Sequence, residues 1–245
     1  MPRAFKIEKM IDRTDSLATK KRGNLFDLPM RLLFVAKTGD SKSTTLGNLL
    51  LKEEGYRNDF TAGKIFIFSG SVKGDAKLKT IITELDVPPE NVFDGFDKEA
   101  LEVTYDVMVD DYNELVEDGE RDRKLLNSLF VFDDLAFNDS MKASGKENTV
   151  RKIFMNGRKF LISCIVISQK YSSVGTVLRE NASGLIVGKA SNKQVDLIEA
   201  DHNYLKDKRS FKEMFREATD PAFGKLIINF SKPGLYFNSE LKPLV

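Results

Sequence analysis

The chain has 245 residues, of which 41% are hydrophobic and 31% are charged, and its formal net charge at pH 7 is +1. This length suits one sizeable α/β domain rather than two, and the near-zero charge excludes a global attraction to nucleic acid, so any such contact would need a local basic surface. A single cysteine and a single histidine exclude an intrachain disulfide and a Cys/His zinc site.

The apolar runs of the sequence have the length of strands rather than of membrane spans. The basic residues near the N-terminus are not followed by an apolar core, so they do not indicate a signal peptide. Cys164 lies in the middle of an apolar run, which favours a small core residue over a nucleophile. We therefore expect a soluble protein that is not secreted and works in a reducing compartment.

Residues 1–28 are polar and lean basic, with a loop expected around Gly23. We predict an N-terminal arm over these residues and one domain over residues 29–245. A role of the arm in packing or in binding a partner is the alternative.

The domain is predicted to alternate strands and helices. Short apolar runs bounded by glycine or polar residues indicate strands, and apolar residues at three- and four-residue spacing indicate helices. Strands are expected at residues 30–35, 64–69, 128–132, 161–168, 184–187 and 225–230, and helices at 43–52, 75–85, 99–117, 147–160, 194–199 and 210–218. Strands separated by helices favour an α/β fold with a mainly parallel sheet covered on both faces.

Residues 36–43, Ala-Lys-Thr-Gly-Asp-Ser-Lys-Ser, lie between the first predicted strand and its helix, which is the context that a P-loop requires. Backbone N–H groups in such a turn cradle phosphate oxygens at the helix N-terminus. Lys42 would reach the β- and γ-phosphates, and Ser43 would offer its hydroxyl to Mg²⁺. The residues expected to bind the nucleotide are Thr38, Gly39, Asp40, Ser41, Lys42, Ser43 and Thr44.

This segment departs from the usual pattern G-x-x-x-x-G-K-[ST] at both glycines, which are Ala36 and Ser41 here. Glycine lets the backbone approach the phosphates closely, so a side chain at Ser41 could crowd them or restrict the loop. The alternative interpretation is a polar strand-to-helix turn whose lysine is merely exposed.

Two carboxylates, Asp133 and Asp134, follow the apolar run at residues 128–132. In P-loop enzymes the first such acid holds Mg²⁺ through water, and the second can orient or activate the attacking water. Helix caps or solvated loop charges would look alike in isolation. Their place after a strand, in a chain with Lys42 and Ser43 at a helix start, favours the catalytic interpretation.

Gln169 follows the strand predicted at residues 161–168. A polar residue at the carboxyl end of a core strand faces the crevice where open α/β sheets bind ligands. Gln169 could hydrogen-bond the γ-phosphate or the attacking water, and a helix cap or turn residue is the alternative.

Together these residues resemble the viral genome-packaging ATPases of the FtsK–HerA superfamily, and most closely the poxvirus-type packaging ATPases of large DNA viruses, virophages and membrane-containing phages. The resemblance covers about residues 30–230. Beyond the P-loop it is carried by residues 129–135 (Leu-Phe-Val-Phe-Asp-Asp-Leu), 156–160 (Asn-Gly-Arg-Lys-Phe) leading into 162–169, and 177–181 (Val-Leu-Arg-Glu-Asn) before the strand at 185–187.

The resemblance implies a RecA-like ATPase that uses ATP and Mg²⁺, assembles into a homo-oligomeric ring and moves double-stranded DNA into a preformed capsid. Its partners would be the DNA and a capsid or capsid-vertex protein. Its location would be the host cytoplasm or the virion, with membrane contact only through the virion.

Hydrolysis in such rings usually needs an arginine from a neighbouring subunit, and the resemblance makes Arg158 and Arg179 the candidates, with Arg151 third. An ordinary surface salt bridge is the alternative for each. The family often has a histidine after the arginine that corresponds to Arg158, where this sequence has Lys159.

Two other functions remain open from the sequence. One is a nucleotide-dependent assembly module with little turnover, which the serine at position 41 favours. The other is a cellular DNA-transfer or segregation ATPase of the same superfamily, against which the small size argues. His202 is expected at the surface. The basic residues at 206–209 could contact DNA phosphates, and a solvated helix end is the alternative.

Overall fold

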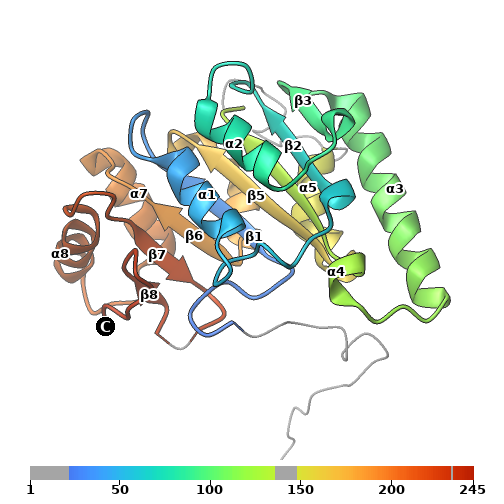
Figure 1. The fold of residues 1–245 in the computed structure, drawn as a ribbon. Coiled ribbons are helices and arrows are strands. Elements are labelled where there is room, and N and C mark those ends of the chain that lie inside the picture. Colours follow the sequence, from blue (N-terminus) through green and yellow to red (C-terminus); the bar gives the residue numbers. More distant parts are fainter. Residues whose placement is uncertain (1–21, 136–147, 233) are drawn as a thin grey trace, which may run out of the picture.

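An eight-stranded sheet is the centre of the computed structural model, which describes residues 22–135, 148–232 and 234–245 (Figure 1). The strand order is β3-β2-β4-β5-β1-β6-β7-β8. Strands β1 to β6 pair in parallel, whereas β7 and β8 add antiparallel pairs at one edge. The strands are β1 (Arg31–Val35), β2 (Ile65–Ser69), β3 (Val92–Asp94), β4 (Ser128–Asp133), β5 (Ile162–Ser168), β6 (Gly184–Val187), β7 (Leu226–Asn229) and β8 (Tyr236–Phe237).

Helices cover both faces of this sheet. They are α1 (Lys42–Leu51), α2 (Ala76–Glu84), α3 (Lys98–Glu117), α4 (Arg123–Leu126), α5 (Thr149–Asn156), α6 (Thr176–Asn181), α7 (Asn192–His202) and α8 (Lys208–Thr219). Helices α1 and α2 lie in front of the sheet in Figure 1, and α3 and α5 to α8 contribute to the other face. Within the described ranges no helix is both long and apolar enough to cross a membrane.

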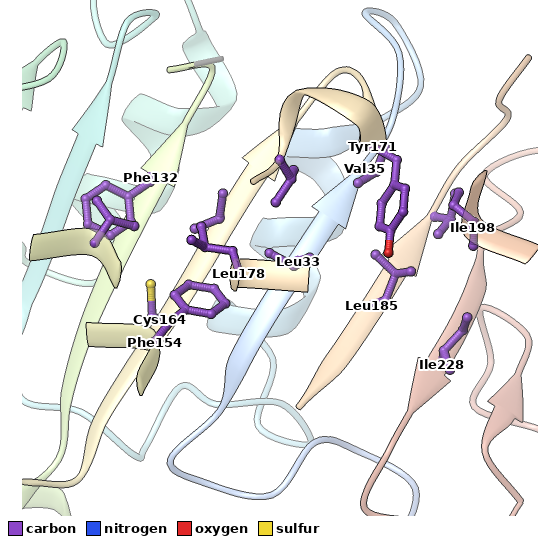
Figure 2. Close-up of a cluster of buried hydrophobic side chains, with 14 of the residues drawn as sticks. Leu33, Val35, Phe132, Phe154, Cys164, Tyr171, Leu178, Leu185, Ile198 and Ile228 are labelled. Carbon is purple, nitrogen blue, oxygen red and sulfur yellow. The ribbon is translucent and has the colours of Figure 1, made fainter. Parts of the chain in front are cut away.

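The two faces follow from the alternation of side chains along each strand. In β1, Leu32 and Phe34 pack against α1 and α2, whereas Leu33 packs on the opposite face. Figure 2 shows Leu33, Leu185 of β6 and Cys164 of β5 in the core on that face. Because the strands are buried on both sides, they read in the sequence as continuous apolar runs.

The strand order brings the three predicted motifs to one edge. Strand β5 lies between β1 and β4, with Val35 opposite Ser168 and Ile167 opposite Asp133. The carboxyl ends of these parallel strands therefore meet. The loop after β1, the acid pair after β4 and Gln169 after β5 share this edge.

The predicted α/β fold class, a mainly parallel sheet flanked by helices, is confirmed. Every predicted strand and helix is present, with ends shifted by a few residues. Among the described strands and α-helices, β3, β8, α4 and α6 were not predicted, because each is too short for a periodic pattern.

The prediction that His202 lies at the surface was wrong. His202 is only 7% exposed, and its ring Nε2 lies 2.7 Å from the hydroxyl oxygen of Tyr171. Tyr171 begins the short 3₁₀ helix η5 (Tyr171–Ser173) after β5, and no local pattern links it to the last turn of α7. Cys164, in contrast, is fully buried as predicted.

The predicted N-terminal arm is described only from residue 22 onward, and its earlier part lies outside the described residues. Phe26 and Leu28 are buried, and the Tyr56 hydroxyl donates to the carbonyl oxygen of Phe26 over 2.8 Å. The ring of Phe26 lies where a Cβ of Gly184 would be, 2.1 Å from its nearest ring atom. Residues 22–28 therefore pack against the domain, and the boundary at residue 28 stays a prediction.

Candidate active site

The loop between β1 and α1 is fixed at both ends by backbone hydrogen bonds. At its start, the N–H of Ala36 donates to the carbonyl oxygen of Ser168 over 3.1 Å. At its end, the N–H of Thr45 donates to the carbonyl oxygen of Ser41 over 2.9 Å, which begins the hydrogen bonding of α1. The free N–H groups of the first turn of α1 lie at the carboxyl edge of the sheet, where an anion would be stabilised.

Two residues of this loop have a left-handed backbone. Gly39 has φ 81°, and Ser41 has φ 58° and ψ 31°. For a residue with a Cβ, this conformation costs roughly 1–2 kcal/mol. The serine side chain makes no capping hydrogen bond to α1 that would offset this cost. Ser41 thus keeps a turn that glycine would form without strain.

Asp40 joins the same loop to the antiparallel edge of the sheet. Its carboxylate accepts a 2.8 Å hydrogen bond from the N–H of Lys189 and pairs over 3.1 Å with Nζ of Lys225. The Lys225 side chain is 2% exposed, and its ammonium also donates to two backbone carbonyl oxygens. A Cβ at Gly188 would lie 1.8 Å from the Asp40 carboxylate, so glycine is required there. A buried ammonium is tolerated only when paired, so this contact fixes the loop.

Ser43 is connected to the start of α2. Its hydroxyl donates to Asp75, whose other carboxylate oxygen caps α2 by accepting from the N–H groups of Lys77 and Leu78. The ammonium of Lys77 donates to the Thr44 hydroxyl over 2.6 Å. Burial raises the pKa of Asp75, but the Ser43 and backbone hydrogen bonds outweigh it, so the pKa is lowered. Since Ser43 gives its only proton to ionised Asp75, its oxygen lone pairs remain available to a cation.

Asp133, the last residue of β4, is buried at 6% exposure. The hydroxyls of Ser69 and Ser71 donate to its Oδ2 over 3.2 and 3.3 Å. Burial raises the pKa of Asp133, and the positive charge of Lys42 and the two hydroxyls only partly oppose this. The carboxylate thus lies within the field of Lys42, in a place where a further cation would stabilise its charged form.

Asp134 and Gln169 are in direct contact. Nε2 of Gln169 donates to Oδ1 of Asp134 over 2.7 Å. Asp134 has a left-handed backbone, φ 53°, and is half-buried, so its carboxylate turns out of the strand. The structure therefore brings together the second acid and the polar residue that the sequence predicted separately.

These oxygen atoms suit Mg²⁺. Ser43 offers a hydroxyl and Asp133 a carboxylate, which are the hard donors that this ion prefers. Among the residues that the structure describes, no group of three or more His, Cys, Asp or Glu side chains could hold a metal. Few protein ligands match an ion that keeps several waters and takes the rest of its ligands from phosphate oxygens.

Of the three candidate arginines, Arg158 lies apart from this edge and Arg179 is already paired. Arg158 is exposed in the short helix η4 (Gly157–Phe160), which precedes β5 and therefore lies at the opposite edge of the sheet. Arg151 lies on α5, with Nε 3.5 Å from the sulfur of Met155. Arg158 is therefore not placed to reach the phosphate loop (residues 36–43) of its own chain.

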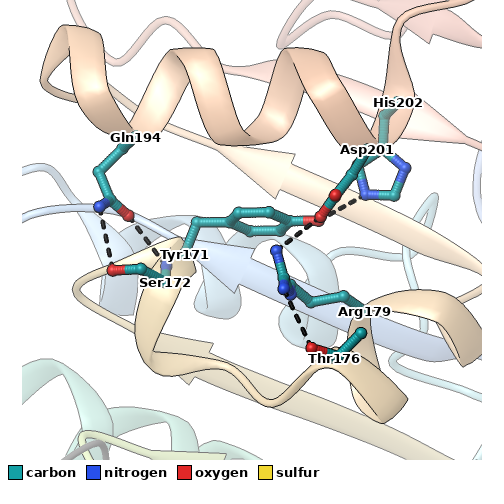
Figure 3. A network of polar contacts seen from close by, with 7 residues as sticks. All are labelled: Tyr171, Ser172, Thr176, Arg179, Gln194, Asp201 and His202. Carbon is teal, nitrogen blue, oxygen red and sulfur yellow. Dashed lines mark hydrogen bonds and ion pairs between the residues drawn. The ribbon is translucent and has the colours of Figure 1, made fainter.

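Arg179 belongs to a polar network on α6 (Figure 3). It pairs with Asp201 over 2.6 Å and its guanidinium lies 5.0 Å from the ring centre of Tyr171. The Tyr171 hydroxyl donates to Asp201 over 2.9 Å, so the 2.7 Å contact with His202 requires the histidine Nε2 to be the donor. Burial is the main cause that lowers the pKa of His202. In this chain, Arg179 orders α6 against α7.

Sequence reasoning missed several residues of the site, among them Asp75, Gly188 and Lys225. Asp75 had a signal, because an aspartate directly before an apolar helical stripe is a capping residue. Gly188 and Lys225 had none. The contact of Lys225 with Asp40 joins positions 185 residues apart, which no local pattern reveals.

Comparison with protein families matches residues 18–231 to the family described as Poxvirus A32 protein. Among curated proteins, none matches the chain.

Solved structures share the fold at low sequence identity. The genome packaging NTPase B204 from Sulfolobus turreted icosahedral virus 2, in complex with AMPPCP, is 10% identical with a TM-score of 0.54, over 82% of this chain and 92% of that one. EssC (ATPases 2 and 3) from Geobacillus thermodenitrificans is 16% identical with a TM-score of 0.56, over 82% of this chain and 38% of that one. The pCW3 conjugation coupling protein TcpA with ATPgS is 15% identical with a TM-score of 0.53, over 86% of this chain and 59% of that one. All share with this chain the fold of P-loop NTPases.

Proposed function

The chain belongs to the poxvirus A32 protein family, and from this premise we propose that it is a Mg²⁺-dependent ATPase that drives double-stranded DNA into a preformed viral capsid. Family membership supports the genome-packaging role. The names of B204, a genome packaging NTPase, and of TcpA, a conjugation coupling protein, agree with a fold used on DNA.

One observation carries the ATPase assignment. The phosphate loop, Asp133 and the Asp134–Gln169 pair end three adjacent strands at one edge of the sheet. Chemistry on a γ-phosphate needs cationic groups on the phosphates, a metal ligand and a group that orients water, and this edge has a residue of each type. A polar turn that merely exposes a lysine would not need a metal ligand or a water-orienting group at the same edge.

Each residue then has a task. The N–H groups at the start of α1 and the ammonium of Lys42 bind the phosphates. Ser43 and Asp133 would hold Mg²⁺, and the ion would supply positive charge against the phosphate oxygens. Asp134 accepts the proton of the attacking water, and Gln169 orients Asp134 and the water.

The neighbouring subunit completes the site in this proposal. Arg158 lies at the opposite edge of the sheet and Arg179 is paired with Asp201, so Arg158 or Arg179, with Arg151 third, would come from the next subunit of a homo-oligomeric ring. Arg158 is exposed at the edge of the sheet and free to enter a neighbour. Arg179 would have to leave Asp201, which makes Arg158 the better candidate.

The further partners are double-stranded DNA and a capsid or capsid-vertex protein, in the host cytoplasm or on the virion. The second candidate function is an assembly module that binds ATP with little turnover. The left-handed Ser41 favours it, because a Cβ beside the phosphates is strained and occupies space that glycine leaves open.

The test is steady-state ATP hydrolysis with and without double-stranded DNA, in the unaltered protein and in Lys42→Ala and Asp134→Asn. DNA-stimulated turnover that both substitutions remove supports the motor. Tight ATP binding without turnover, even with DNA at high protein concentration, supports the assembly module. Turnover that persists in Lys42→Ala would refute the site.

A further inference from the structure

A cavity of about 320 Å³ runs along the flank of α1 that carries Thr45, Asn48 and Lys52. Thr44, Thr45 and Asn48 of α1 line one wall, and Phe223, Lys225 and Leu241 line the opposite side. Its volume lies at the lower end of the range of about 300–1,000 Å³ for small-molecule pockets. Most of its wall is apolar, with a few polar groups, as small-molecule pockets usually are.

This cavity begins at the phosphate loop. Lys225 lines the cavity and also pairs with Asp40 of that loop. The ion pair of these two residues therefore lies between the cavity and the phosphate loop. Thr44 and Thr45 lie in the first turn of α1, directly after Lys42 and Ser43. A molecule whose phosphates occupy the loop would therefore extend its remaining part along this flank of α1.

Phe223 is an exposed aromatic at the rim of the cavity. It is 65% exposed, although burial of a phenylalanine is favourable. Its backbone is left-handed, with φ 61°, which is a strained conformation for a bulky residue. Residues held under such strain cluster at ligand-binding sites. An unpartnered ring beside an apolar cavity presents a face on which a flat heterocycle can stack.

We propose that this cavity binds the base and ribose of the nucleoside triphosphate, with the base stacked on Phe223 and its polar edge near Asn48. This rests on the proposed function, because it extends the phosphate site to the rest of the nucleotide. Asn48 is exposed and offers both a donor and an acceptor to a base edge.

The chain contains no tryptophan, so Phe223→Trp introduces a single indole fluorophore at the stacking position. ATP is expected to quench its fluorescence, and inorganic tripolyphosphate, which has no base, is expected to leave it unchanged. Tyr204→Trp is the matched control, because Tyr204 is 66% exposed and lines a different cavity. ATP should leave the fluorescence of that variant unchanged.

Binding by calorimetry gives the second readout. Phe223→Ala should weaken ATP binding roughly tenfold, as loss of a stacking aromatic does, and leave tripolyphosphate binding as it was. Phe223→Tyr should restore ATP affinity. If saturating ATP neither quenches the indole nor binds more weakly to Phe223→Ala, the base lies elsewhere and the inference fails. If the unaltered protein binds neither ATP nor tripolyphosphate, the proposed function itself fails.

Discussion

The amide of Gln169 donates a 2.7 Å hydrogen bond to the carboxylate of Asp134, across the boundary between β5 and β4. Each residue follows its own strand, and the hydrogen bond fixes the orientation of the carboxylate. A water held by both would lie on the side of the phosphate loop, because β1 is the other neighbour of β5. The pair is therefore expected to act as one unit in hydrolysis.

The first prediction concerns this unit. Asp134→Asn should lower the rate of hydrolysis by about 10²–10⁴-fold, since it removes a base, and Gln169→Ala should lower it less. The double substitution should be no slower than Asp134→Asn alone, because groups that act together have non-additive effects. Single-turnover hydrolysis measures all three. Multiplied losses in the double variant would mean that the two residues act separately, and unchanged ATP affinity is the control for folding.

Ser41→Gly is the second prediction. Relief of the left-handed serine contributes roughly 1–2 kcal/mol, and the greater freedom of glycine in the unfolded chain costs roughly 0.5–1 kcal/mol. The net gain in stability is therefore small. ATP affinity and turnover should rise, because the Cβ no longer restricts the loop.

Ser41→Ala is its control, because it keeps the Cβ and removes only the hydroxyl. Nucleotide titration and steady-state hydrolysis of both variants separate the two causes. If Ser41→Ala raises turnover as much as Ser41→Gly does, the hydroxyl and not the strained Cβ limits the reaction.

Much of the fold and half of the site follow from local sequence. Apolar runs and helical stripes predicted the strands and helices because burial imposes those periods. The loop after β1 and the acid pair after β4 were predicted because their residue types are required by phosphate chemistry. The parallel order then placed them together without further information.

Contacts between distant segments could not be predicted. The burial of His202 depends on Tyr171, and the fixing of Asp40 depends on Lys225. Each pair forms only after the sheet has assembled, and neither partner has a distinctive neighbourhood in the sequence. Strands β7 and β8 are short, so the sequence did not indicate that they pair antiparallel at the edge of the sheet.

The ion pair of Asp40 and Lys225 gives the third prediction. Asp40→Asn leaves a buried ammonium without its charge partner, and such a loss costs about 3–5 kcal/mol. The midpoint of chemical denaturation should fall accordingly, and ATP affinity should fall with it because the loop is released. Asp40→Asn combined with Lys225→Met should recover most of the stability, because no unpaired charge remains.

Gly188→Ala tests the same contact with both charges present. Its Cβ would lie 1.8 Å from the carboxylate and displace Asp40. We expect weaker ATP binding from this variant as well. Normal ATP affinity in both Asp40→Asn and Gly188→Ala would show that the loop does not depend on this contact.

His202 gives the fourth prediction, on pH. Burial lowers its pKa in the folded state below the usual value of about 6.5, although Asp201 opposes this. Below pH 6.5 the unfolded chain binds a proton that the folded chain resists, so stability must decrease as the pH falls through the folded pKa. Thermal unfolding between pH 7 and pH 5 measures this. It is the only histidine of the chain, so no other imidazole contributes.

His202→Gln is the control variant. The glutamine amide can still donate to the Tyr171 hydroxyl, but it does not titrate. This variant should lose less stability than the unaltered protein over the same pH range. Equal losses would assign the pH dependence to the carboxylates instead.

The fifth prediction distinguishes the two main arginines by stability. Arg179→Ala leaves Asp201 without its partner and removes a cation over Tyr171, so it should lower the free energy of unfolding by about 1–2 kcal/mol. Arg158 is exposed, so Arg158→Ala should leave stability within about 0.5 kcal/mol. A loss of hydrolysis in Arg158→Ala without a loss of stability would therefore be a loss of chemistry.

Mixing two inactive variants shows whether that arginine acts between subunits. Arg158→Ala keeps an intact phosphate loop, and Lys42→Ala keeps an intact Arg158. In a mixed ring, some phosphate loops of the first variant lie beside the arginine of the second, so hydrolysis should reappear only at those interfaces. An arginine that acts within its own chain gives no such recovery at any mixing ratio. If Arg158→Ala is itself fully active, the same mixture with Arg179→Ala tests the second candidate, with unfolding measured in parallel to account for its structural role.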